Sequence, residues 1–290
     1  MDRSSSFSRR SFMGLTASTA ALWPIAGHAW SSQAQSSGSA DAPWQGLKVG
    51  LASYSFSKLP LVAAIKGIQR IGVNYVSIKD AHLSMKSTAE ERKAVVQKFR
   101  DAGITPLSCG VVTLSDDERQ LRNAFEYTRD LGVPTMVCKP TRESLPVLDK
   151  LVKEFDLKLA IHNHGPEDKV WPSPLDVWGA IQEYDKRIGV CVDVGHTARC
   201  GVDPAQALIT CAGRLYDVHF KDLAKKGPKS GGAEVGRGVL DVRGMLKALL
   251  DIGYAHLVGL EYEKDMNDPI PGAAESFGYI RGVLACMNNR

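Results

Sequence analysis

The sequence predicts an α/β protein of the (β/α)8 barrel class, built as a single domain. Three observations lead to this prediction. Short runs rich in Val, Ile and Leu alternate with segments whose apolar residues recur at helical spacing. These pairs fill a stretch of roughly 250 residues, which is the usual length of such a barrel. The last four runs end on side chains that can bind metals, as expected if parallel strands open at one mouth.

Each unit follows the same order of strand, helix and turn. The strands are expected to begin near Lys48, Tyr75, Thr105, Pro134, Lys158, Arg187, Leu215 and His256. The helices are expected at Leu59–Ile71, Ala89–Ala102, Asp117–Leu131, Glu143–Phe155, Pro174–Glu183, Pro204–Ala212, Val242–Ile252 and Gly272–Ala285. Four helices are followed by a glycine that suits a left-handed C-cap, namely Gly72, Gly103, Gly132 and Gly253. An open doubly wound sheet shares this order, but no GxGxxG motif follows the first strand, so the barrel is preferred.

The N-terminal residues are interpreted as a targeting segment. Arg9 and Arg10 precede a weakly apolar run, Gly14–Ala26, and a small-residue stretch, Gly27–Ala29. The pattern resembles a twin-arginine (Tat) signal, with a disordered basic tail as the alternative. The run is too short and too rich in Ala, Ser and Thr for stable membrane insertion. The sequence therefore predicts a signal peptide at 1–30, a flexible tether at 31–46, a barrel at 47–290 and periplasmic localisation through the Tat export machinery.

The charge distribution limits the classes of binding partner, and the cysteine spacing bears on metal binding and disulfides. The formal net charge is +4, and the basic excess is spread along the chain, so neither nucleic acid nor membrane is predicted as a partner. A small-molecule ligand is favoured, and a homo-oligomer is compatible with the sequence. None of the six cysteines shows CxxC spacing. They are interpreted as buried free thiols, with a disulfide as the alternative because an oxidising periplasm would permit one.

A divalent metal site is predicted at the ends of strands five to eight. His162, Asp193, His219 and Glu261 each end an apolar run, in LAIHNHG, GVCVDVGH, LYDVHFKD and LVGLEYE. Alone, Asp193 would be interpreted as a turn or N-cap residue and His219 as a core histidine. On adjacent strands the four form a mixed nitrogen and oxygen set suited to one Mn²⁺, Co²⁺, Zn²⁺ or Fe²⁺ ion.

Further polar side chains follow other strands at the same mouth. Lys79 ends strand two, Lys139 ends strand four, and His164 lies two residues after His162. Lys221 and Glu263 follow the ligands of strands seven and eight, where they could orient the ligands or bind substrate, and Lys139 is a further candidate to bind substrate. Lys79 and His164, with Glu261, are the candidate proton carriers, although a solvated surface lysine is an equal alternative for Lys79.

These motifs together resemble the sugar phosphate isomerase/epimerase family with the xylose isomerase-like TIM barrel. The resemblance rests on IHNHGPEDK, DVGHT, VHFKD with the EVGRG loop, and GLEYEKDM, and covers Leu47 to Met287. It implies a (β/α)8 barrel with a divalent metal on Asp193, His219 and Glu261. It also implies that His196 and Arg237 contact substrate. Many epimerases of this family have a glutamate where this chain has His162, which argues against proton exchange between two metal-bound glutamates.

The resulting hypothesis is a metal-dependent sugar isomerase or epimerase that removes a proton next to the carbonyl of an unphosphorylated keto-sugar. Exported proteins rarely meet sugar phosphates, which motivates the unphosphorylated substrate. A 3-keto-glycoside β-eliminating lyase is the first alternative, because the HNHG segment resembles relatives proposed to act on oxidised sugars. A non-catalytic periplasmic sugar-binding protein is the second. An endonuclease IV-like role is disfavoured, because a multi-zinc site needs more ligands than this chain supplies.

Overall fold

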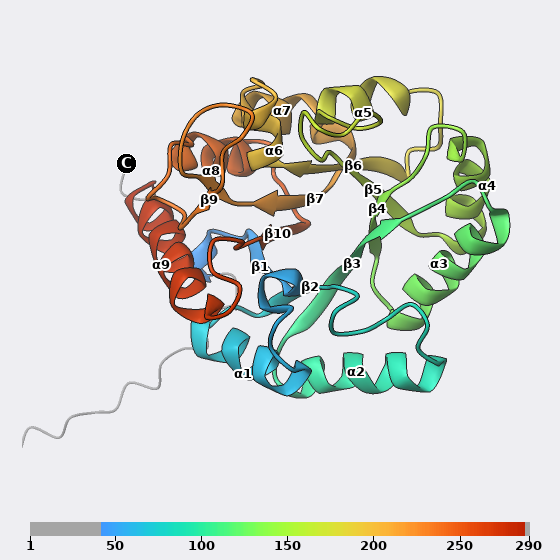
Figure 1. Cartoon of the computed structure of the whole chain (residues 1–290), viewed down its shortest axis with the longest axis horizontal. Helices are drawn as coiled ribbons and strands as arrows, with labels where there is room; N and C mark the ends of the chain where they lie inside the picture. The colour runs from blue at the N-terminus through green and yellow to red at the C-terminus, as the bar shows by residue number, and fades with distance from the viewer. Residues whose placement is uncertain (1–41, 288–290) are drawn as a thin grey trace, which may run out of the picture. The chain divides into compact units, whose positions relative to one another are not determined.

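The computed structural model describes residues 42–287, which contain a closed barrel of eight parallel strands (Figure 1). The strands follow one another around the barrel in chain order, and β1 closes the ring by pairing with both β2 and β10. An open sheet would leave two unpaired edges, so the barrel prediction is confirmed. The barrel strands are β1 (Lys48–Ala52), β2 (Tyr75–Ile78), β3 (Thr105–Thr113), β4 (Thr135–Lys139), β5 (Lys158–His162), β6 (Ile188–Asp193), β7 (Leu215–Phe220) and β10 (Leu257–Leu260).

Helices connect consecutive strands and form the outer layer of the barrel in Figure 1. They are α1 (Leu61–Ile71), α2 (Ala89–Asp101), α3 (Glu118–Leu131), α4 (Leu145–Phe155), α5 (Pro174–Ala180), α6 (Val194–Arg199), α7 (Pro204–Thr210), α8 (Val242–Asp251) and α9 (Pro269–Met287). The predicted strand starts agree with the structure to within one residue. The helix predictions differ most at the end of α5, which is three residues shorter than expected, and at the start of α9, which is three residues earlier.

Six short elements were not expected from the sequence: three 3-10 helices (Ala42–Trp44, Ser53–Phe56 and Ala212–Arg214), α6, β8 and β9. Helix α6 has six residues, and β8 (Asp222–Leu223) pairs antiparallel with β9 (Gly232–Ala233) beside the barrel. Elements of this length contain too few residues to show an apolar period. Helix α6 follows Asp193 at the end of β6, and β8 follows Lys221, the residue after β7, so these elements lie beside predicted site residues at the mouth of the barrel.

The predicted glycine C-caps are confirmed. Gly72, Gly103, Gly132 and Gly253 have φ values of 79°, 73°, 65° and 63°. A residue with a Cβ atom is strained in this conformation, whereas glycine adopts it freely. The glycines therefore end α1, α2, α3 and α8 and turn the chain toward the next strand.

The strands pack on both faces, which separates an outer core from the barrel interior. On β6, for example, Val190 and Val192 belong to the large core shared with the helices, whereas Cys191 packs inside the barrel with Val137 and Ala160. Successive side chains of a strand point to opposite faces, so Asp193 shares the inner face with Cys191. The polar ends of the strands thus project into the mouth of the barrel.

The packed structure begins slightly before the predicted domain start. Trp44, assigned to the tether by its position, is buried against α9, with its ring 6.2 Å from that of Phe277 and 5.3 Å from the Arg281 guanidinium. The predicted signal peptide and most of the tether lie outside the described residues. Among residues 42–287, no helix is both long enough and apolar enough to cross a bilayer. All six cysteines are free, and four of them are buried.

Candidate metal centre

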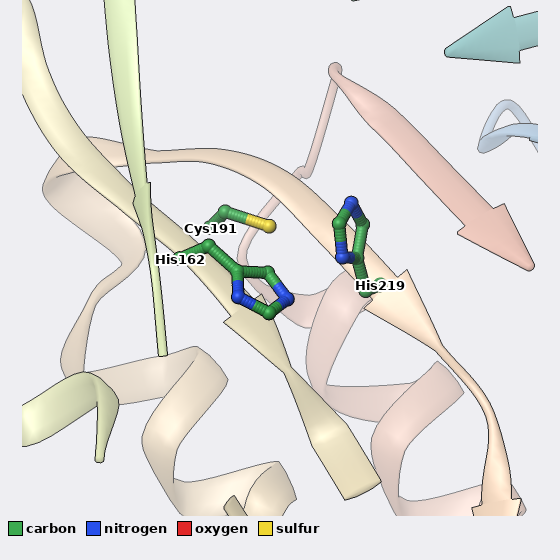
Figure 2. A group of neighbouring side chains, drawn as sticks. All are labelled: His162, Cys191 and His219. Atoms are coloured by element: carbon green, nitrogen blue, oxygen red, sulfur yellow. The ribbon is translucent and has the colours of Figure 1, made fainter. Parts of the chain in front are cut away.

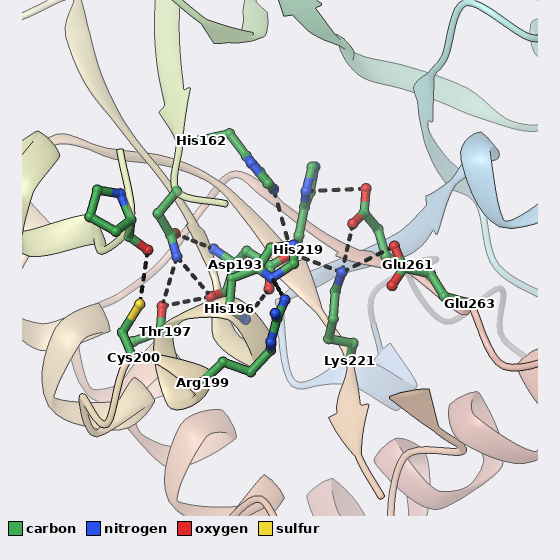
Figure 3. A network of polar contacts seen from close by, with 12 residues as sticks. His162, Asp193, His196, Thr197, Arg199, Cys200, His219, Lys221, Glu261 and Glu263 are labelled. Atoms are coloured by element: carbon green, nitrogen blue, oxygen red, sulfur yellow. Dashed lines mark hydrogen bonds and ion pairs between the residues drawn. The ribbon is translucent and has the colours of Figure 1, made fainter. Parts of the chain in front are cut away.

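Four neighbouring strands bring the predicted metal ligands together at the mouth of the barrel. His162 and Asp193 end β5 and β6, His219 lies near the end of β7, and Glu261 directly follows β10. Strand pairing places Asp193 opposite His219. One potential ligand atom from each of the four side chains lies within 4.8 Å of those of the others, and all four side chains are buried. The predicted convergence of these residues is therefore confirmed (Figure 3).

The local backbone aims Asp193 at this cluster. Its Oδ1 accepts a hydrogen bond of 2.7 Å from the His196 amide, which caps the N-terminus of α6 and leaves Oδ2 facing the other ligands. Asn163 holds the preceding backbone, because its Oδ1 accepts a 2.9 Å hydrogen bond from the Asp193 amide. Asp193 thus combines the N-cap role expected of a lone strand-end aspartate with a place in the cluster. Asn163 is a positioning residue that sequence reasoning left without a role.

The imidazole nitrogens have room for a metal bond. His162 lies with Nε2 3.5 Å from Asp193 Oδ2, the limit for a hydrogen bond, and neither of its nitrogens has a well-aligned partner among the described residues. His219 Nδ1 is likewise without a hydrogen bond there and lies 3.2 Å from Glu261 Oε1. Buried polar nitrogens normally have hydrogen-bond partners. The unpartnered nitrogens of His162 and His219 lie next to the carboxylates of Asp193 and Glu261, and a divalent cation bound between them would satisfy all four groups.

Electrostatics give the four side chains the protonation states that metal binding requires. Burial lowers the pKa of His162 and lowers that of His219 well below its usual value, so both rings are neutral. Burial alone would raise the pKa of Asp193 and Glu261, but the positive charge of Lys221, joined at Glu261 by that of Lys79, outweighs it and holds both pKa values well below the ordinary range. Two neutral nitrogens and two anionic oxygens suit the predicted ions.

Two buried lysines neutralise the carboxylates. Lys221 Nζ lies 2.9 Å from both Asp193 Oδ2 and Glu261 Oε2, and 3.4 Å from Glu263 Oε1. Lys79 Nζ lies 3.3 Å from both Glu261 Oε1 and His219 Nε2. Burial alone would lower the pKa of Lys221, but the carboxylates raise it well above its usual value. Both lysines were predicted at the mouth, and the structure shows that they contact the ligands directly.

A cavity of about 450 Å³ opens above the cluster. Six residues singled out in the sequence line it: Lys79, His162, His164, His196, Glu261 and Glu263. The remaining lining residues come from β3 and from the segments after β1 and β2, and no role was predicted for them: Tyr54, Ser57, Asp80, Ala81, Gly110 and Val111. For the four residues that follow β1 and β2, position after a strand was the available signal, but their residue types resemble those of any loop. The cavity has the size expected of a small-molecule site.

His164 and His196 stack face to face on one wall of this cavity. Their ring centroids are 5.1 Å apart with an interplanar angle of 21°. Burial is the largest cause that lowers the pKa of His164, and burial lowers that of His196 to about 4. Arg199, on α6, lies with one guanidinium nitrogen 3.0 Å from His196 Nδ1. Both imidazoles are therefore neutral near pH 7 and can exchange hydrogen bonds with a ligand.

Two predicted substrate-binding residues do not reach the cavity. Arg237 is exposed at the surface and forms an ion pair with Glu275 on α9. Lys139 lies close enough to contribute to the lowered pKa of His164, but its ammonium group pairs with the buried Asp168. The path of each loop decides these contacts, and strand-end position alone does not reveal it.

The fold and the site together define a class of protein: a (β/α)8 barrel with a buried His, Asp, His and Glu cluster beneath a small-molecule cavity. The chain belongs to the xylose isomerase-like TIM barrel family, whose model matches residues 65–283. The resemblance identified from the motifs is thereby confirmed at the level of this barrel family.

Individual relatives are more distant. The rhizopine catabolism protein MocC of Rhizobium meliloti is 27% identical over 147 residues, which are 46% of this chain and 45% of that protein. Among solved structures, the apo 3-keto-D-glucoside 4-epimerase YcjR of E. coli is 17% identical, with a TM-score of 0.67 over 81% of this chain and 99% of that one. The IOLI protein, solved with zinc, is also 17% identical, with a TM-score of 0.64 over 81% of this chain and 98% of that one.

Proposed function

We propose that the protein is a divalent-metal-dependent sugar isomerase or epimerase that removes a proton next to the carbonyl of an unphosphorylated keto-sugar. The observation that carries this proposal is the position of the buried four-residue cluster beneath a cavity of about 450 Å³. Structures with the same fold include a 3-keto-D-glucoside 4-epimerase, a D-tagatose 3-epimerase-like protein and an L-ribulose 3-epimerase. These neighbours support the reaction class.

The four ligands would hold the metal ion, and other side chains at the mouth would transfer protons or position the ligands. A divalent ion on His162, Asp193, His219 and Glu261 would supply Lewis-acid stabilisation of negative charge that develops on the substrate oxygen. Lys79, His164 and Glu261 line the cavity and are the candidates to remove or return the carbon-bound proton. Lys221 would hold the carboxylates of Asp193 and Glu261 in position through its 2.9 Å contacts.

The charge balance of the site supports an unphosphorylated substrate. A phosphate group is usually held by cationic side chains that are free to pair with it. Lys79 is the cationic residue that lines the cavity, and it already pairs with Glu261. Beside the cavity, Lys221 pairs with three carboxylates and Arg199 pairs with Glu167. A phosphate would have to compete with a carboxylate for each of these groups, and at Lys79 and Lys221 the competing carboxylates of Glu261 and Asp193 are buried.

A β-eliminating lyase acting on 3-keto-glycosides is the second candidate. His162 stands where many epimerases of this family have a glutamate, so the cluster holds one glutamate, Glu261, and lacks a symmetrical pair of carboxylate bases. One base and one acid suffice for elimination, because the base takes the proton and the acid protonates the leaving group. His164, whose ring is neutral, could act as the base, and the ammonium group of Lys79 could protonate the leaving group; both side chains line the cavity.

Exchange in D₂O tests the proposal and separates the two reactions. The protein is loaded with Mn²⁺ or Co²⁺ and incubated with unphosphorylated keto-sugars and 3-keto-glycosides, and NMR follows the products. We expect solvent deuterium at the carbon beside the carbonyl, with loss of the aglycone only if the enzyme is a lyase. Turnover without deuterium incorporation or a primary isotope effect would exclude proton abstraction. Tight sugar binding without metal and without turnover would identify a binding protein.

We also propose that the protein is exported in the folded state by the twin-arginine route. Arg9 and Arg10 support this proposal, and they lie outside the described residues. Folding before export would allow metal to be loaded in the cytoplasm, where availability selects the ion. Changing both arginines to lysine should leave the protein in the cytoplasmic fraction. An unchanged periplasmic yield would count against this route.

A further inference from the structure

A buried thiol lies directly below the predicted metal ligands. Cys191 is fully buried, and its side chain points into the barrel rather than toward the helices. Its sulfur and one nitrogen each of His162 and His219 all lie within 4.8 Å of one another. Figure 2 shows the three side chains facing a common space from three adjacent strands.

Strand register explains this arrangement. Cys191 is the pairing partner of His162 on β5, and it precedes Asp193 by two residues on β6. Two residues of a strand span roughly 6.6 Å, so Asp193 lies one level above Cys191 on the same face of the strand. His162 is level with Cys191 and His219 is level with Asp193, and each ring has a nitrogen within 4.8 Å of the ligand atoms of both sets. His162 and His219 therefore belong to two ligand sets, one completed by Asp193 and Glu261 and the other by Cys191.

We propose that His162, Cys191 and His219 form a second metal site that takes thiophilic divalent ions such as Cd²⁺ and Zn²⁺, and that it cannot be filled together with the oxygen-containing set. Sulfur and imidazole ligands favour these softer ions, whereas carboxylates favour Mn²⁺. Three protein ligands with one open position are also a common arrangement for zinc. The thiol must lose its proton to solvent when the ion binds, because a coordinating cysteine is a thiolate.

Occupation of the lower site would remove the ion from the substrate. The imidazoles of His162 and His219 would then bind the ion held by Cys191. Asp193 and Glu261 would remain paired with Lys221 through the 2.9 Å contacts described above. Thiophilic ions should therefore displace Mn²⁺ and inhibit turnover. The identity of the bound ion would act as a switch between two positions in one barrel. This inference concerns ligands only and does not depend on the reaction that the enzyme catalyses.

Cadmium titration of the full-length protein tests the second site. A cadmium–thiolate bond produces an ultraviolet charge-transfer band that nitrogen and oxygen ligands do not produce. The wild-type protein should develop this band at one equivalent of Cd²⁺, whereas Cys191→Ala should not. The affinity of this variant for Cd²⁺ should also fall by about tenfold or more. Mn²⁺ affinity, measured by electron paramagnetic resonance, should be similar in both proteins because Mn²⁺ prefers oxygen and nitrogen.

Cys138→Ala is the matched control. Cys138 is an equally buried free thiol on β4, but it packs in the outer core and not in the barrel interior. Its removal should leave the band intact. X-ray absorption of wild-type protein with bound Zn²⁺ should show one sulfur neighbour at about 2.3 Å, and this measurement needs no variant. Wild-type protein that binds Cd²⁺ without the band, a band that survives in Cys191→Ala, or zinc without a sulfur neighbour would overturn the proposal.

Discussion

Replacing Asp193 with alanine should remove the bound metal and abolish turnover while the barrel remains folded. The substitution deletes one of two anionic ligands and leaves Lys221 with less negative charge around its ammonium group. Loss of an outer-shell partner already weakens metal binding by about 10- to 100-fold, so loss of a ligand should cost at least this much. Elemental analysis of purified protein measures the metal, and circular dichroism measures the fold.

The N-cap role of Asp193 calls for two controls. Loss of an N-cap costs about 1 kcal/mol of stability by itself. Asp203→Ala removes the N-cap of α7, where Oδ1 accepts a 2.9 Å hydrogen bond from the Ala205 amide, and should leave the metal content unchanged. Asp193→Asn keeps an acceptor for the cap of α6 but removes the charge, and should still lose metal. Full metal occupancy in Asp193→Ala would show that the ligand assignment is wrong.

Replacing His164 with glutamine should lower the rate of the chemical step by about 10²- to 10⁴-fold, the usual contribution of a general acid or base, with metal still bound. His164 lines the cavity but lies outside the four-residue cluster, so it can act on the substrate without holding the ion. Single-turnover kinetics and deuterium exchange at the carbon beside the carbonyl measure the effect. Glutamine preserves hydrogen bonding but cannot carry a proton near neutral pH.

His82→Gln is the matched control for this prediction. His82 is another histidine that follows a barrel strand, but its side chain is buried, its Nε2 lies 3.1 Å from the Leu59 carbonyl oxygen, and it does not line the cavity. The control should keep the wild-type exchange rate. An exchange rate in His164→Gln within a few-fold of wild type would exclude His164 as the proton carrier and leave Lys79 and Glu261 as the candidates.

The positions of site residues could be predicted from the sequence wherever strand direction alone decides them. Parallel strands of a barrel all end at one mouth, so a ligand-type side chain at the end of an apolar run must lie near its counterparts on adjacent strands. His162, Asp193, His219 and Glu261 satisfied this condition, and the structure confirms that they converge. The glycine caps were equally predictable, because their conformation depends on local backbone sterics.

Loops were less predictable because their path depends on contacts that are distant in sequence. Arg237 occupies the expected loop, yet its guanidinium pairs with Glu275 on α9 and not with the cavity. Lys139 ends the expected strand, yet Asp168 holds its ammonium group. Neither partner could be chosen from the sequence, because several carboxylates compete for each cation at similar separations along the chain.

The sequence by itself determined the barrel, the order of its strands and the four side chains that meet at its mouth, because periodicity and strand direction are properties of each segment alone. Only the tertiary structure decided that Lys221 bridges Asp193 and Glu261, and that Cys191 lies beside the imidazoles of His162 and His219. These contacts depend on the register between neighbouring strands, which shifts at Val190/Cys191 where β6 meets β7. Register is set by packing around the whole ring, so it emerges only when the barrel closes.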